Sequence, residues 1–173
     1  WTSDQMEKSG YRHYMLKEIH EQSQAIANTI SGHVDPSTGI IHIPELNKIA
    51  DSLKNLNRIS IVACGTARHA GLVGKYYLER FARISTTVDF GSEFRYRQPV
   101  LEKNSLTLLI SQSGETADTL AGLRESKAQG VSTLSICNVR ESSLARESDL
   151  VLYTNAGPEI GVASTKAYSA QLA

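Results

Sequence analysis

The strongest constraint on the fold is a set of short β-branched apolar runs that alternate with helix-like stretches. The runs at 58–65, 105–111 and 131–138 are apolar on successive residues, which is typical of strands buried on both faces. Strands that alternate with helices predict a parallel sheet with helices on both faces. We therefore expect a doubly wound α/β fold with roughly five parallel strands. The remaining expected elements are strands at 84–90 and 148–155 and helices at 67–83, 116–129 and 162–173.

The residues before the first run form a different kind of segment. Residues 1–10 are polar and without a period, which is typical of a linker. Apolar residues recur at helical spacing over Tyr11–Ile30, and a second short helix is expected to begin at Pro44. These patterns divide the chain into an N-terminal linker and helical arm, residues 1–56, and an α/β domain, residues 57–173.

Composition and charge exclude several classes of function. Among the 173 residues, 18 basic side chains balance 18 acidic ones. The sequence has no basic stripe of the kind that binds nucleic acid. No apolar run approaches the roughly 20 residues that cross a membrane, and no signal peptide is visible. Two isolated cysteines favour a reducing, cytoplasmic location. Because the chain starts at Trp1 and stops within an expected helix, we expect it to be part of a longer protein.

Polar segments follow three of the expected strands. In open α/β sheets, ligands bind beyond the carboxyl ends of the strands. The segments CGTARH, SQSGET and NAGPEIGVAST stand at such ends, after the runs at 58–65, 105–111 and 148–155. Each brings small polar residues or glycine to the start of a helix. The segments DFGSEF and CNVRESS, which follow the other two strands, are less suggestive.

The segment SQSGET has the composition of a phosphate cradle. A helix start supplies backbone N–H groups and about half a unit of positive charge to an anion. Ser111, Ser113 and Thr116 add hydroxyl donors, Gln112 adds an amide, and Gly114 allows a positive φ. Together these groups suit a phosphate ester held without a metal ion or a cofactor. Ser113 or Thr116 could instead cap the following helix, and the local pattern leaves both interpretations open.

No catalytic group emerges from the pattern. Cys64 is interpreted as a buried, inert thiol, because no nearby sequence supplies a base. The histidines lack the spacing of metal ligands, so no metal site is expected. Lys166 is interpreted as a solvated helix lysine, although it could also approach an anion. The segment EFRYRQ, residues 93–98, is interpreted as a surface or interface segment.

Several motifs together resemble one family. The segments CGTARHAGLVGKYYLE, SEFRYR, SQSGETADTLAGLRESK and TNAGPEIGVASTKAY are similar to the isomerase half of the glutamine–fructose-6-phosphate aminotransferases. The resemblance extends from Tyr11 to the end and concerns the first of two sugar-isomerase (SIS) domains. It implies that the phosphate of a hexose phosphate is held by the polar loops and that Val162 and Ser164 touch the sugar. The implied substrate-binding residues are Cys64, Gly65, Thr66, Ser111, Gln112, Ser113, Thr116, Val162 and Ser164.

One position departs from this family. Many members carry a serine after the CGT segment, and its hydroxyl contacts the phosphate, whereas this chain has Ala67. Since a neutral hydrogen bond contributes only about 1 kcal/mol net, the departure does not put the whole pocket in doubt.

The resemblance also implies what lies outside the chain. Members use a glutaminase domain, a second SIS domain and a C-terminal tail to make glucosamine 6-phosphate from fructose 6-phosphate, and their catalytic groups lie in those parts. We therefore expect a homodimeric parent enzyme and a fragment that binds either sugar phosphate without converting it. Two alternatives stay open: a phosphosugar-sensing domain of a transcription regulator, and a free-standing sugar-phosphate isomerase.

Overall fold

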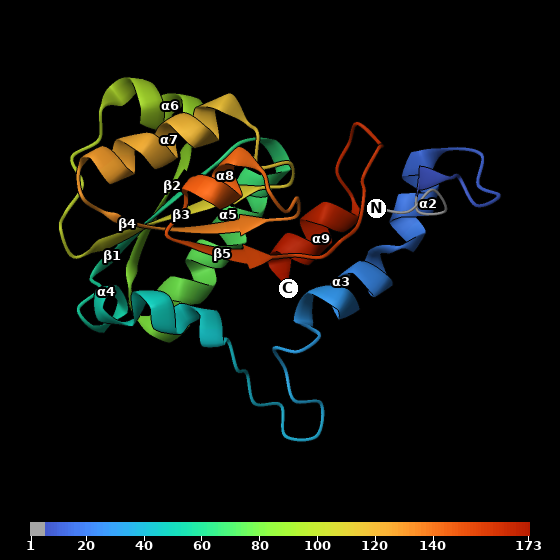
Figure 1. The fold of residues 1–173 in the computed structure, drawn as a ribbon, viewed down its shortest axis with the longest axis horizontal. Coiled ribbons are helices and arrows are strands. Elements are labelled where there is room, and N and C mark those ends of the chain that lie inside the picture. The colour runs from blue at the N-terminus through green and yellow to red at the C-terminus, as the bar shows by residue number, and fades with distance from the viewer. Residues whose placement is uncertain (1–5) are drawn as a thin grey trace. The chain divides into compact units, whose positions relative to one another are not determined.

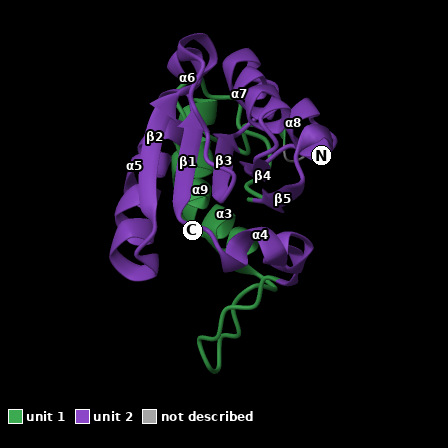
Figure 2. Ribbon diagram, turned by 90° about the vertical axis from the view of Figure 1, so that its left-hand side faces the viewer, with its two compact units in different colours: residues 1–43, 154–173 green, residues 44–153 purple. Residues whose placement is uncertain are grey.

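The computed structural model describes residues 6–173, so the first five residues of the expected linker lie outside the described residues. The chain divides into two compact units (Figure 2). The sheet unit is Pro44–Tyr153, and the helical unit joins the described residues up to Ile43 to Thr154–Ala173. The expected division into an arm, residues 1–56, and an α/β domain, residues 57–173, is a different division of the chain and stays a prediction.

Five parallel strands form the sheet unit's centre (Figure 1). Their order is β2-β1-β3-β4-β5, which is the order of flavodoxin-like doubly wound folds. The predicted fold class is therefore confirmed. The strands are β1 (Arg58–Ala63), β2 (Ser85–Phe90), β3 (Ser105–Ser111), β4 (Ser132–Cys137) and β5 (Leu150–Tyr153).

Helices cover both faces of this sheet, as Figure 1 shows with α6 and α7 above the strands and α4 below. Successive residues of β1 point to opposite faces, so Ile61 joins one apolar core and Val62 the other. Both side chains are fully buried, which explains the continuous apolar runs in the sequence. The first core lies under η1 (Pro44–Ile49), α4 (Ala50–Lys54) and α5 (Gly65–Tyr77), and the second under α6 (Gly91–Arg97), α7 (Ala117–Ala128) and α8 (Ser143–Glu147).

Two helices of the sheet unit were not predicted, and one takes an unexpected form. The segment interpreted as a surface stretch is helix α6, in which Phe94 is fully buried while Tyr96 is 74% exposed. The five-residue α8 has only Leu144 buried. The helix expected at 67–83 begins at Gly65 and continues beyond α5 as a π-helix, η2 (Leu78–Ala82).

The helical unit consists of α2 (Tyr14–His20), α3 (Gln22–Ile30), α9 (Lys166–Leu172) and the segments that join them. The helix expected over Tyr11–Ile30 is present as two helices, which start at Tyr14 rather than Tyr11 and are separated at Glu21. Ala25 of α3 packs with Ala156 and Ala170 in a small core. The hydroxyl of Ser169 donates to the Gln22 side chain over 2.5 Å, which ties α9 to α3.

Candidate functional site

The loops after β1 and β3 are neighbours at the carboxyl edge of the sheet. The two strands pair in parallel with Ala63 opposite Ile110, so each loop begins at the same level. From β1 the chain moves outward to β2 and then returns to β3 on the other side, which makes this the topological switch point. The fold therefore brings the CGTARH and SQSGET segments to the position where such sheets bind ligands.

The SQSGET loop has a fixed internal structure. The buried Ser111 hydroxyl accepts a hydrogen bond from the Gly114 N–H over 3.0 Å and lies 3.3 Å from the Thr116 hydroxyl. The Ser113 hydroxyl accepts from the Glu115 N–H over 3.2 Å. A hydroxyl that accepts one bond still carries a proton that it can donate. The loop thus holds its hydroxyl groups in place while they remain able to donate to an anion.

The residue after β4 and the first two residues of α8 hold this loop through their backbone N–H groups. The backbone N–H of Asn138 donates to the Gln112 carbonyl over 3.2 Å, and that of Leu144 donates to the Gly114 carbonyl over 3.0 Å. The Ser143 N–H donates to the Glu115 carboxylate over 2.7 Å. The segment CNVRESS is less suggestive in the sequence because its contribution to the loop comes from backbone groups rather than from side chains.

The loop hydroxyls do not cap the helix that follows. Thr116 is the N-cap residue of α7, but no side-chain hydrogen bond caps this helix. The Ser113 hydroxyl is bonded within the loop instead. Helix α8 provides a contrast, because its N-cap residue Ser142 accepts from the Ala145 N–H over 3.3 Å. The capping interpretation is therefore wrong for Ser113 and Thr116.

The charges around the loop are balanced locally. Asp118, in the first turn of α7, would repel an anion, but Arg95 of α6 lies 3.4 Å from its carboxylate. Hydrogen bonding by the backbone N–H of Ser143 holds the pKa of Glu115 below its ordinary value of 4.5. Glu115 is therefore ionised at neutral pH and is engaged by α8 rather than available as a general base.

Lowering the pH should loosen this support. Because the pKa of Glu115 is lowered in the folded chain, its bond to Ser143 stabilises the fold above pH 4.5 and is lost as pH falls through the lowered pKa. We expect the amide signal of Ser143, followed by NMR, to titrate with a midpoint below 4.5 and to stop titrating in Glu115→Gln. A midpoint at or above 4.5 would contradict the contact.

The first loop supplies the other expected residues of the sheet unit. Gly65 has a φ of +57° and begins α5, and the side chain of Thr66 is exposed beside it. Cys64 is a free thiol that is half-buried, with its sulfur 3.9 Å from the Thr119 hydroxyl. Ala67, where many family members carry serine, is buried in the first core. Seven of the nine expected residues thus lie at or just beyond the carboxyl ends of two adjacent strands, β1 and β3.

The other two expected residues lie in the helical unit. Val162 is fully exposed and Ser164 is half-buried, and both stand in the segment before α9. The carboxylate of Glu159 accepts from the backbone N–H groups of Thr165 over 2.8 Å and Ala167 over 3.2 Å. Helix α9 therefore begins at Lys166 instead of residue 162, and Glu159 stabilises its first turn.

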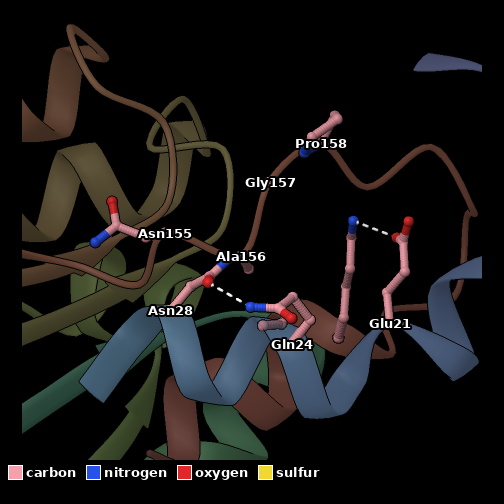
Figure 3. Close-up of a pocket in the computed structure, with 9 residues that line it drawn as sticks. Glu21, Gln24, Asn28, Asn155, Ala156, Gly157 and Pro158 are labelled. Atoms are coloured by element: carbon pink, nitrogen blue, oxygen red, sulfur yellow. Dashed lines mark hydrogen bonds and ion pairs between the residues drawn. The ribbon is translucent and has the colours of Figure 1, made fainter. Parts of the chain in front are cut away.

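A pocket in the helical unit was not predicted (Figure 3). Gln24 and Asn28 project from α3 and are joined by a hydrogen bond of 2.8 Å. Lys166 is 4% exposed and its ammonium lies 2.7 Å from the Glu21 carboxylate, so its interpretation as a solvated lysine is wrong. The pocket is lined by Glu21, Gln24, Ala25, Asn28, Asn155, Ala156, Gly157, Pro158 and Lys166, none of which is an expected substrate-binding residue.

The described residues, 6–173, contain neither a cluster of metal ligands nor a membrane-spanning helix. In that part of the chain, no group of three or more His, Cys, Asp or Glu side chains is placed to hold a metal ion. None of the helices there is both long and apolar enough to span a membrane.

Comparisons with known proteins identify the family. A glutamine–fructose-6-phosphate aminotransferase from Symbiobacterium thermophilum is 52% identical over 99% of this chain, which spans only 28% of that protein. The C-terminal domain of glucosamine-fructose-6-phosphate aminotransferase from Francisella tularensis has a TM-score of 0.88 at 48% identity, over 96% of this chain and 46% of its own. Glucosamine-6-phosphate deaminase from Thermotoga maritima has a TM-score of 0.72 at 26% identity, over 92% and 47% of the two chains. Residues 52–173 match the SIS domain, and the chain therefore belongs to the SIS domain family.

Proposed function

We propose that this chain is the sugar-phosphate-binding domain of an isomerizing glutamine–fructose-6-phosphate aminotransferase and that its ligand is fructose 6-phosphate or glucosamine 6-phosphate. The observation that carries the proposal is the SQSGET loop at the switch point, whose hydroxyls are held in place but do not cap α7. The similarity to aminotransferases over 99% of the chain supports the choice of sugar phosphate.

The phosphate would be held by dipoles and hydroxyl groups rather than by a cation. Helix α7 has 12 residues, and its N-terminus presents partial positive charge to the loop. In the proposed complex, Ser111, Gln112, Ser113 and Thr116 bind the phosphate, and Thr66 donates from the neighbouring loop. Cys64 and Gly65 line the same site. Val162 and Ser164 meet the sugar hydroxyls.

A comparison of three ligands tests the assignment. Isothermal titration of the chain with fructose 6-phosphate, glucosamine 6-phosphate and arabinose 5-phosphate should show weak binding of the two hexose phosphates and weaker binding of the pentose phosphate. Preference for arabinose 5-phosphate would favour a free-standing isomerase instead. Binding of none of the three would contradict the proposed function.

Removing two loop hydroxyls should weaken this binding. Because hydrogen bonds to a charged phosphate contribute about 1.5–3 kcal/mol each, Ser113→Ala combined with Thr116→Ala should lower the affinity for fructose 6-phosphate by more than about ten-fold. Ser132→Ala is a matched control. Ser132 stands at the amino end of β4, away from the loop, and its hydroxyl lies 2.8 Å from the hydroxyl of Ser52. Unchanged affinity of the double variant, with a lower melting temperature, would contradict the phosphate role.

The rest of the proposal concerns the whole protein. We propose that a glutaminase domain and a second SIS domain belong to the same protein. The aminotransferase from Symbiobacterium thermophilum supports this proposal, because this chain spans only 28% of its length. The chain alone should then form no glucosamine 6-phosphate from fructose 6-phosphate and ammonia, and product formation would overturn this view.

We further propose a cytoplasmic homodimer, and two free cysteines support a reducing compartment. Light scattering of the chain would test dimerisation.

A further inference from the structure

The segment that carries Val162 is held at its start by a buried carboxylate from far away in the sequence. Glu18 of α2 is 2% exposed. Its Oε1 accepts from the backbone N–H of Ile160 over 2.6 Å and from that of Gly161 over 3.1 Å. Its Oε2 accepts from the Gly161 N–H over 3.1 Å. These bonds join residues 142 and 143 positions apart, within one compact unit.

A carboxylate at such a place needs these bonds. Burying an ionised group is unfavourable unless hydrogen bonds replace the water that it loses. The Ile160 and Gly161 N–H groups provide that replacement, and in return Glu18 fixes their orientation. Close packing adds to the effect, because a Cβ atom at Gly161 would lie 2.5 Å from the Glu18 Oε2. The backbone just before Val162 is therefore restricted by both charge and space.

The same short segment is also held at its end. Glu159 accepts from Thr165 and Ala167, so carboxylates engage backbone N–H groups on both sides of residues 162–164. Between these two attachments the Val162 side chain is fully exposed and Ser164 is half-buried. A segment fixed in this way loses little conformational entropy when it meets a ligand, which favours binding.

We propose that Glu18 is a positioning residue for the sugar end of the ligand: its buried carboxylate fixes residues 160–164 so that Val162 and Ser164 can contact the sugar. This inference rests on the proposed function and deepens it. Glu18 itself does not touch the ligand. Its effect should appear only with ligands that have a sugar, because the proposed function assigns the phosphate to other residues.

The test compares two ligands in matched variants. In Glu18→Gln, which keeps the size of the side chain, the affinity for fructose 6-phosphate should fall about five-fold or more, while that for inorganic phosphate should stay within about two-fold. Amide hydrogen exchange at Ile160 and Gly161 should accelerate about ten-fold or more. Asp149→Asn is the control: its carboxylate accepts from the Thr133 N–H over 2.8 Å in the sheet unit, so it should change stability without changing the ratio of the two affinities.

The outcomes separate this inference from the proposed function. If the unmodified chain binds neither ligand, the proposed function fails and the inference fails with it. If it prefers fructose 6-phosphate and Glu18→Gln keeps that preference, only the role of Glu18 is overturned. If Glu18→Gln does not fold, Gly161→Ala displaces the segment with Glu18 in place, and the same selective loss of sugar-phosphate affinity is expected. Equal loss with both ligands would overturn the inference.

Discussion

Gly114→Ala should abolish phosphate binding and destabilise the chain by about 2–5 kcal/mol, because backbone strain and steric crowding both raise the free energy of the folded chain. Gly114 has a φ of +68°, a conformation that alanine adopts only with strain. A Cβ atom there would also lie 2.2 Å from the Ser142 hydroxyl oxygen and 2.8 Å from the Cys137 sulfur. The loop and the start of α8 would both have to move. Chemical denaturation and a fructose 6-phosphate titration measure the two effects.

Two further variants separate strain from crowding. Gly130 has a φ of +71° but open space around a Cβ atom, so Gly130→Ala should cost only about 1 kcal/mol and leave binding unchanged. Adding Ser142→Gly to Gly114→Ala removes the nearest contacts and should recover part of the stability, since glycine at an N-cap costs only a few tenths of a kcal/mol relative to serine. Equal losses at Gly114 and Gly130 would mean that crowding is unimportant.

Phe94→Ala should be the second large effect, with a loss of about 3–5 kcal/mol in unfolding free energy. Phe94 is fully buried and packs with the core of α7 and α8. Its removal leaves a cavity beneath the helices that support the SQSGET loop. Tyr96→Ala, on the same helix, is the control: that side chain is 74% exposed, so its loss should change stability by less than about 0.5 kcal/mol.

Binding distinguishes this variant from Gly114→Ala. Phe94 lies outside the loop, so Phe94→Ala should bind fructose 6-phosphate with nearly unchanged affinity at temperatures where the chain is folded. Gly114→Ala should fail to bind even when folded. Loss of binding in folded Phe94→Ala would mean that α6 contributes to the site directly.

The sheet was predictable because its signal is local and strong. The run at 105–111 became β3 with the same bounds, since its residues are apolar on both faces. Helices α6 and α8 were missed because short helices have little stability of their own. They form where Phe94 and Leu144 become fully buried against α7, and no local pattern shows that burial.

The candidate site was predictable in its chemistry but not in its support. The hydroxyls of Ser111, Ser113 and Thr116 are visible in the sequence, whereas the bonds that hold their loop come from backbone N–H groups, which nearly every residue supplies. The burial of Lys166 depends on Glu21, which is 145 residues away in the chain. Such pairings arise from the tertiary fold, so the spacing of residues could not predict them.

The central claim is that the SQSGET loop binds the phosphate of a sugar phosphate. The most direct measurement is an NMR titration of the isotope-labelled chain with fructose 6-phosphate, followed through its backbone amide signals. The account predicts the largest shift changes at residues 112–117 and at Thr66, and their loss when Ser113→Ala and Thr116→Ala are combined. Shift changes confined to other residues, or an unchanged response in the double variant, would contradict it.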